Sequence, residues 1–444
     1  MQFYAFGCLF FYIYNKIRAW DLIFFLHNLT FFSMNKPVFL ANDLFTEEDN
    51  AFMLECRQTI HRWPEGGFDL PRTVAFVESQ LDSMGIEHTG KYGISGVVGY
   101  INYGATCSSA GVSDTGHPYT VAIRADMDAL PVTEKTGLPF SSERPGIMHA
   151  CGHDAHTAVL LGVARVLKRN EDKLACRVKL IFQASEESAF DKRSGAKLMC
   201  DDGVLDDVDV IVGCHVDNNY PAGVLGIHPG PCSSNSNPIT VEFFGRSCHA
   251  THPEQGCDAL AMAVRFVNDY QYALTRQVNP SEVVASSVCS LRTDNDSFNI
   301  IADHAVVKMT LRTFSDETND RIENLIRSIA QSSATQLGGS CKVDAGINYP
   351  FNYNDPSVCA AMHASHAKVV GEENAITAGL DITSEDFSFY SKIRPSCYFR
   401  LGTRNEARGC TQALHANDFR IDDAALAVGC KAFVQFVLDC NGKF

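Results

Sequence analysis

Hydrophobic and polar positions along the chain switch between the period of a helix and the period of a strand. Apolar residues spaced three and four apart predict amphipathic helices at residues 48–62 and 72–85. A third helix is expected at 155–169, and β-rich runs predict strands at 96–101, 119–124, 177–182 and 208–212. Strands that alternate with helices in this way are typical of a mostly parallel sheet with helices on both faces.

This pattern is interrupted by a polar, turn-forming stretch at 231–238. The next segments are predicted to be strand, helix, strand, strand, helix and strand, at 239–244, 256–274, 283–291, 304–312, 318–336 and 341–349. That order is the signature of a ferredoxin-like α+β unit. After residue 355 the earlier pattern resumes, and it ends in a helix at 423–438. We therefore expect one α/β domain, formed by residues 34–236 and 351–444, with a smaller domain inserted at 237–350.

Residues 1–33 are dense in Phe, Tyr, Leu and Ile and belong to neither domain. Lys16, Arg18 and Asp21 divide them into apolar pieces of roughly 15 and 12 residues, shorter than the 18 or so expected of a membrane-spanning helix. The charges also lie in the middle of the segment, unlike those of a signal peptide. We expect an apolar leader, and both an anchor and a translational extension upstream of Met34 remain open.

Composition narrows the class of protein. Of the 444 residues, 45% are hydrophobic and 20% are charged, as in a globular protein with a sizeable core. The formal charge of -15 opposes binding to phosphate backbones and acidic membrane surfaces, so neither a nucleic-acid partner nor a stable membrane partner is expected. Seventeen cysteines occur without a CxxC pair, which fits neither a zinc ribbon nor a disulfide framework. We expect a reducing compartment, the cytoplasm.

The densest group of potential metal ligands lies just before the helix expected at 155–169. Five such residues fall within eight positions: His149, Cys151, His153, Asp154 and His156. Cys151 and His153 are two residues apart, which does not place them on one helical face but suits a turn held by the start of a helix. Thiolate and imidazole bind zinc, manganese and related divalent ions. This density favours a metal site over purely structural histidines.

Three further segments could complete such a site. Glu186 and Glu187 follow one predicted strand, His215 follows the next, and His415 lies near the chain end. In open α/β sheets, sites form at the carboxyl ends of strands. Taken alone, the two acids are equally well explained as solvated loop residues, and His215 as a core residue. Their weight comes from completing a set with the cluster around Cys151.

Two loops add polar groups. Asp126 and Asp128 follow the strand at 119–124 and are expected to project on the same side of it. In the inserted domain, a loop that leaves the first strand presents His249 and His252. Spacing alone explains that loop equally well as an ordinary polar loop.

Taken in order, these segments resemble metallopeptidase family 20, and within it the amidohydrolases that include aminoacylases, hippurate hydrolases, aminobenzoyl-glutamate hydrolases and auxin-conjugate hydrolases. The resemblance runs from about residue 43 to residue 443. The segments that carry it are Arg124-Ala-Asp-Met-Asp-Ala-Leu-Pro, His149-Ala-Cys-Gly-His-Asp-Ala-His, Phe182-Gln-Ala-Ser-Glu-Glu, Gly213-Cys-His-Val, Ser384-Glu-Asp-Phe-Ser and Leu414-His.

The resemblance implies two divalent metal ions, manganese, zinc or cobalt. By matching residues, the ligands would be Cys151, His153, Glu187, His215 and His415. Glu186 would be the general base of a metal-activated water that hydrolyses the amide bond of an N-acyl amino acid or a related small conjugate. We further expect Asp128 to orient a metal ligand without binding the metal itself, because it lies at a strand end, two residues after Asp126.

The inserted domain resembles the family's lid and dimerisation domain, which implies a homodimer. His249 would then reach a substrate bound in the partner subunit, and Asn299 and Arg312 would lie near the substrate. The residues also leave alternatives open. Peptide hydrolysis of the dipeptidase or carboxypeptidase type could use the same site, Cys151 with His153 could form a thiol hydrolase, or the chain could be a catalytically silent ligand-binding relative.

Overall fold

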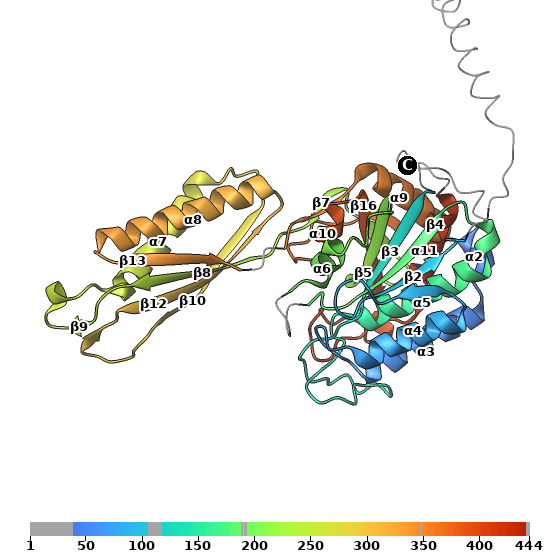
Figure 1. Cartoon of the computed structure of the whole chain (residues 1–444), viewed down its shortest axis with the longest axis horizontal. Helices are drawn as coiled ribbons and strands as arrows, with labels where there is room; N and C mark the ends of the chain where they lie inside the picture. The colour runs from blue at the N-terminus through green and yellow to red at the C-terminus, as the bar shows by residue number, and fades with distance from the viewer. Residues whose placement is uncertain (1–38, 105–117, 188–189, 191–192, 347–348, 441–444) are drawn as a thin grey trace, which may run out of the picture. The chain divides into compact units, whose positions relative to one another are not determined.

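The computed structural model describes residues 39–104, 118–187, 190, 193–346 and 349–440 (Figure 1). The leader expected at residues 1–33 lies outside this range. Within it, no helix combines the length and the apolar character needed to cross a membrane.

A central sheet of eight strands organises the larger part of the described chain, in the order β1-β2-β4-β3-β5-β16-β6-β15. Its middle is parallel, because β4 pairs with β3, β3 with β5, and β5 with β16 in the same direction. The strands are β1 Glu87–Thr89, β2 Val97–Ile101, β3 Thr120–Asp126, β4 Arg177–Gln183, β5 Val210–Pro221, β6 Leu225–Ile227, β15 Ala375–Thr377 and β16 Ser396–Arg404.

Helices cover both faces of this sheet (Figure 1). Alternate residues of the central strands enter different cores: Ile123 of β3 packs with the helices of one face, whereas Ala122 packs with those of the other. Strands buried on both faces explain the nearly continuous apolar runs in the sequence. The helices are α2 Ala41–Leu44, α3 Glu47–Arg62, α4 Pro71–Ser83, α5 His153–Arg169, α6 Gly195–Asp201, α9 Pro356–Val370, α10 Ser388–Ser391 and α11 Ala424–Asp439.

The inserted segment forms a second, four-stranded antiparallel sheet in the order β10-β12-β8-β13. Helices α7 and α8 lie on one face of it and share its apolar core (Figure 1). The elements are β8 Asn237–Phe244, α7 Ala259–Gln277, β10 Val284–Thr293, β12 His304–Thr313, α8 Asp316–Gln336 and β13 Ser340–Ala345. This is the ferredoxin-like order, so the predicted fold class, a mostly parallel α/β sheet with an inserted α+β unit, is confirmed.

Two small sheets complete the described strands. β9 Cys248–His249 pairs with β11 Ile300–Ile301 at the end of the inserted unit, and β7 Gly230–Ser233 pairs with β14 Asn352–Asn354 where the chain leaves and re-enters the larger part. Short 3-10 turns occur at Glu171–Lys173, Pro253–Gln255 and Glu406–Arg408.

Candidate active site

Helix α5 places Cys151 and His153 at the carboxyl edge of the central sheet. Gly152 between them has a φ of 88° and is the N-cap of α5. A Cβ atom at Gly152 would lie 2.4 Å from a methyl carbon of Val216 in β5, so only glycine allows this approach. The turn therefore holds both side chains, which are almost fully buried, against the end of the neighbouring strand.

Glu186 and Glu187 follow the end of β4, after Ser185, whose φ is 53°. One carboxylate fixes this turn, because Asp128 accepts hydrogen bonds from the backbone N–H groups of Glu186 and Glu187, both at 3.0 Å. The backbone oxygen of Asp128 also lies 2.8 Å from Nδ1 of His153. Asp128 therefore links the acidic pair to the start of α5.

His215 and His415 approach Cys151 from two other elements. His215 lies within β5, and its Nε2 atom is 3.3 Å from Sγ of Cys151. His415 lies in a loop, with a φ of 66°, and its Nε2 atom is 3.3 Å from the same sulfur and 3.1 Å from Oε1 of Glu187. Left-handed backbone at a non-glycine residue is uncommon, and such strain concentrates at functional sites.

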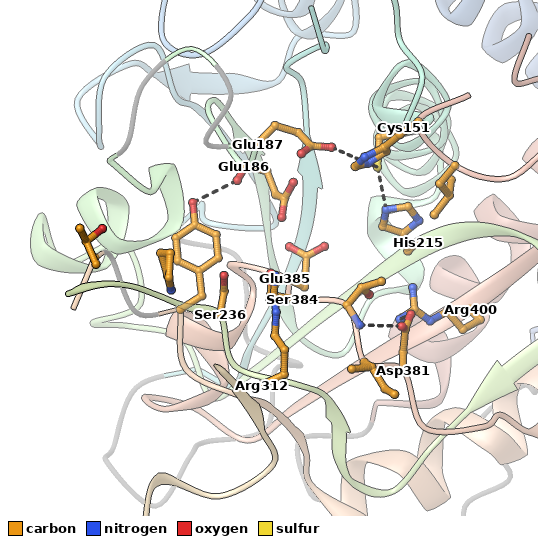
Figure 2. Close-up of a pocket in the computed structure, with 18 of the residues that line it drawn as sticks. Cys151, Glu186, Glu187, His215, Ser236, Arg312, Asp381, Ser384, Glu385 and Arg400 are labelled. Atoms are coloured by element: carbon orange, nitrogen blue, oxygen red, sulfur yellow. Dashed lines mark hydrogen bonds and ion pairs between the residues drawn. The ribbon is translucent and has the colours of Figure 1, made fainter. Parts of the chain in front are cut away.

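The structure thus brings together all six residues expected to bind metal or act as general base. Their ligating atoms form overlapping groups within 4.8 Å of one another: Cys151, His153 and His215; Cys151, Glu187 and His415; His153, Glu186 and Glu187. A cavity of about 900 Å³ opens over them, and Cys151, Glu186, Glu187 and His215 all line it (Figure 2).

Hydrogen bonds turn the imidazole nitrogens toward this cluster. Nδ1 of His153 lies 2.8 Å from a backbone oxygen, and Nδ1 of His215 lies 2.7 Å from the backbone oxygen of Val216, so both Nδ1 atoms donate. The Nε2 atoms then carry the free lone pairs. Nε2 of His153 is buried and has no hydrogen-bond partner among the described residues. A buried, unpaired imidazole lone pair beside a thiol and a carboxylate fits a divalent metal ion.

The electrostatic environment separates the two glutamates. Burial, followed by the nearby carboxylates of Glu385 and Glu187, raises the pKa of Glu186 well above its usual range. Burial also acts to raise the pKa of Glu187, but the hydrogen bond with His415 and the charge of His153 outweigh it and lower the pKa. The two adjacent carboxyl groups therefore differ in pKa. Glu186 has the higher affinity for a proton, whereas Glu187 is stabilised in the charged form that a metal ligand needs.

A buried network behind the cluster was not assigned from the sequence. His156 lies with Nδ1 2.6 Å from Oδ1 of Asp126, while its Nε2 accepts the backbone N–H of Val216 at 2.9 Å. Asp126 also accepts from Arg124 at 2.6 Å, and Arg124 donates to Asp386 at 2.8 Å. The strand β5 that carries His215 is thereby tied to α5 and β3. Sequence spacing placed these residues near the site but gave no sign of which would pair.

The three residues expected from the inserted unit behave differently. Arg312 lines the cavity, and its Nη1 atom donates to the backbone oxygen of Asn235 at 3.1 Å. His249 and Asn299 are exposed and do not line the cavity; Nδ1 of His249 lies 2.7 Å from the hydroxyl of Thr251. Within the described chain, the structure therefore brings Arg312 to the site but not His249 or Asn299.

Known proteins with similar sequences cover almost the whole chain. Thermostable carboxypeptidase 1 of Saccharolobus solfataricus is 32% identical over 409 residues, which span 91% of this chain and 98% of that protein. IAA-amino acid hydrolase ILR1-like 4 of Arabidopsis thaliana is 31% identical over 392 residues, 87% of this chain and 84% of that protein.

A similar solved structure is that of the Bacillus subtilis YXEP protein, described as a dinuclear metal-binding peptidase of the M20 family. It has a TM-score of 0.76 and 26% identity, and the match covers 90% of this chain and all of that one. The family model of peptidase family M20/M25/M40 matches residues 122–439, which include every residue of the cluster described above. The chain therefore belongs to peptidase family M20/M25/M40.

Proposed function

We propose that the chain is a metal-dependent amidohydrolase that removes the acyl group from an N-acyl amino acid or a related small conjugate. The observation that carries this proposal is the convergence of one thiol, three imidazoles and a carboxylate beside a cavity that a second carboxylate, Glu186, also lines. The plant relative named IAA-amino acid hydrolase supports a substrate in which an acyl group is joined to an amino acid.

We assign the metal ligands to Cys151, His153, Glu187, His215 and His415. This set offers a donor mixture suited to two divalent ions, and the dinuclear neighbour from Bacillus subtilis supports that number. The thiolate favours the softer ions, zinc and cobalt, and the carboxylate and imidazoles also suit manganese. When bound, such ions supply Lewis acidity, which lowers the pKa of a water molecule to about 7 and polarises a carbonyl group.

Glu186 is the general base in this proposal. Its carboxylate lines the cavity, and its raised pKa makes the charged form a stronger base, which can take a proton from the attacking water and deliver it to the departing amine. Asp128 acts through Glu186 and Glu187, because its two hydrogen bonds fix the turn that carries them. It is therefore a positioning residue.

The inserted unit, residues 237–350, serves as the lid and dimerisation domain. Arg312 binds the carboxylate of the amino acid half, and its place in the cavity lining supports this role. In a homodimer, His249 donates a hydrogen bond to the oxyanion that develops on the substrate bound in the partner subunit, and Asn299 lies beside that substrate. One such donor is typically worth about 3 kcal/mol. We place the enzyme in the cytoplasm, where Cys151 stays reduced and free to bind metal.

Peptide hydrolysis at the same site is the second candidate, and the archaeal relative named carboxypeptidase favours it. A peptide and an N-acyl amino acid share the scissile amide and the terminal carboxylate that Arg312 would bind. The peptide also has a free amino group at its other end, which the N-acyl amino acid lacks.

Turnover of a matched panel separates these functions. Each of several N-acyl amino acids is compared with the dipeptide that has the same carboxyl-terminal residue, with manganese, zinc or cobalt added, before and after chelation. The proposal expects hydrolysis of acyl conjugates that chelation abolishes and metal restores. Activity that survives chelation and is lost on alkylation of Cys151 would instead indicate a thiol hydrolase, and a protein that hydrolyses nothing in the panel would be a binding relative.

A further inference from the structure

Arg400 is a charged residue of the cavity wall that the proposed mechanism does not use. It lies in β16 directly beside His215 of β5 in the parallel register. Neighbouring strands are about 4.8 Å apart and paired residues leave the sheet on the same face, so the two side chains are neighbours. Both line the cavity, and Arg400 lies between His215 and Asp381 (Figure 2).

Arg400 lies outside the apolar cores that the described residues form. Phe399 and Leu401, its neighbours in β16, pack into the core on one face of the sheet. Tyr398 points to the other face, as Arg400 must, and its hydroxyl donates to Glu385 at 2.7 Å. This face of β16 therefore presents polar groups to the loop that carries residues 381–385.

The hydrogen bonds of Arg400 leave part of its guanidinium free. Nη2 donates to Oδ2 of Asp381 at 2.6 Å, and the other oxygen of Asp381 accepts the backbone N–H of Thr383 at 2.8 Å. Among the described residues, Asp381 is the hydrogen-bond partner of Arg400. A guanidinium has five N–H donors, and the remaining ones are not sealed in the protein, because the side chain is 14% exposed and lines the cavity.

The negative charge of Asp381 also determines which substrate group can bind favourably beside Arg400. The ion pair is neutral as a whole, so a second carboxylate brought beside it would be repelled by Asp381 while gaining from Arg400. A neutral oxygen acceptor gains the hydrogen bond without that repulsion. An apolar group would leave the donors unpaired and displace the water that satisfies them.

The other arginine of the lining indicates which half of the substrate reaches this wall. Under the proposed function, on which this inference rests, Arg312 binds the carboxylate of the amino acid half. The acyl half then remains for Arg400, on the wall formed by β5 and β16.

We propose that Arg400, held by Asp381, makes the enzyme select N-acyl substrates whose acyl group carries a neutral hydrogen-bond acceptor, such as a keto or carboxamide oxygen. Arg400 is a specificity-determining residue in this assignment. It contacts the substrate and takes no part in the proton transfers.

The test compares N-levulinoyl-L-alanine, which has a keto oxygen in its acyl chain, with N-pentanoyl-L-alanine, which has the same chain without it. The wild-type ratio of kcat/KM for these two substrates should fall about tenfold or more in Arg400→Met. The double variant Arg400→Met with Asp381→Asn should show the same fall, because it removes both charges and leaves no unpaired carboxylate. N-succinyl-L-alanine should be a poorer wild-type substrate than the levulinoyl compound.

Two controls make the outcome specific. Arg404→Met, on the same strand but paired with Glu406 and outside the cavity lining, should leave the ratio unchanged. The ratio for N-acetyl-L-glutamine against N-acetyl-L-methionine should also stay the same in Arg400→Met, because those compounds differ in the amine half. A change there instead would overturn the assignment to the acyl half.

An unchanged ratio of kcat/KM for the levulinoyl and pentanoyl substrates in Arg400→Met would overturn the proposal. An equal fall of kcat/KM for both substrates leaves that ratio unchanged and would mean that Arg400 only supports the loop at 381–385.

Binding gives a readout independent of turnover. Calorimetry of the Glu186→Gln protein should show tighter binding of the levulinoyl compound, lost in the variant that also carries Arg400→Met. If the wild type hydrolyses neither compound, the proposed function fails. If the Glu186→Gln protein binds the levulinoyl and pentanoyl compounds equally or binds neither, the role of Arg400 is contradicted independently of turnover.

Discussion

Polar residues are buried at the edge of the central sheet and exposed at the tip of the inserted unit. At the sheet edge, Cys151, His153 and Glu186 are buried, and hydrogen bonds from other elements fix their surroundings. At the tip, His249 is exposed, and the side chain of Phe298 is fully exposed beside Asn299. One chain therefore completes the environment of the buried set and not that of the exposed tip, as expected if a second copy supplies the rest.

The largest expected effect separates roles within the buried set. Glu186→Gln should lower kcat by roughly 10²- to 10⁴-fold, because it removes the proposed general base while keeping the size of the side chain. Its metal content, measured by mass spectrometry, should equal that of the wild type. Glu187→Gln is the matched variant next to it and should lose metal as well as activity. Unchanged turnover in Glu186→Gln, or metal loss equal to that of Glu187→Gln, would contradict the division of roles.

The next effect tests whether the exposed set works across subunits. His249→Ala should lower kcat roughly 10²-fold or more, because the proposed oxyanion donor is lost, without changing metal content. Mixing this impaired protein with the impaired Glu186→Gln protein should raise activity above that of either alone, since one active site of the mixed dimer then has both residues.

The control for this mixture is a Glu186→Gln protein that also carries His249→Ala. Mixed with His249→Ala, it should give no such rise, because no site then combines Glu186 with His249. If the first mixture also shows no rise after subunit exchange, His249 does not act on the partner's substrate, and the exposed tip has another role.

Most of the fold could be predicted because its signals are local. The predicted strand at 177–182 and helix at 155–169 are β4 Arg177–Gln183 and α5 His153–Arg169, and the order of elements in the inserted unit was predicted correctly. Apolar periodicity reports burial of a segment whatever its partner. It does not report strand order, so nothing in the sequence showed that β16 would lie between β5 and β6.

The candidate site follows the same division. Cys151 and His153 were conspicuous because they are close in sequence, and their meeting with Glu187, His215 and His415 was expected from the family resemblance. The pairing of His156 with Asp126 and the backbone of Val216 depends on how α5 packs on two strands. The position of Arg400 beside His215 depends on strand order. Both are tertiary facts without a local signal.

A smaller effect, on metal affinity, is expected when His156 loses its hydrogen bonds to Asp126 and Val216. His156→Phe keeps a ring but loses the acceptor for Val216 N–H and the partner of Asp126, so the strand that carries His215 is less well fixed. Metal affinity, measured by competition with a chelator, should fall about tenfold, at the low end of the effect of residues behind a ligand. His366→Phe, at a buried histidine that packs on Phe399 away from the cluster, should leave metal affinity unchanged. Equal affinities in all three proteins would show that the network is structural only.

The smallest effect concerns stability and leaves the chemistry untouched. His61 is buried between two carboxylates, with Nδ1 2.8 Å from Asp154 and Nε2 3.3 Å from Glu134. Burial acts to lower the pKa of His61, but the charge of Asp154 and the hydrogen bonds outweigh it and raise the pKa to about 8. A raised pKa gives stability that is complete below about pH 6.5 and is lost as the pH rises through 8.

The free energy of unfolding should therefore fall by about 2 kcal/mol between pH 6 and pH 9 because of His61. Chemical denaturation at both pH values should show this fall in the wild type and not in His61→Gln. The inserted unit offers the contrast: His304 faces Glu242 at 3.0 Å, but both side chains are about a third exposed, so solvent screens this pair and His304→Gln should change the free energy of unfolding at pH 6 by less than about 1 kcal/mol. If the fall persisted in His61→Gln, the buried network would not be the source of the pH-dependent stability. If His304→Gln cost as much stability as His61→Gln, the contrast between the two regions would be lost.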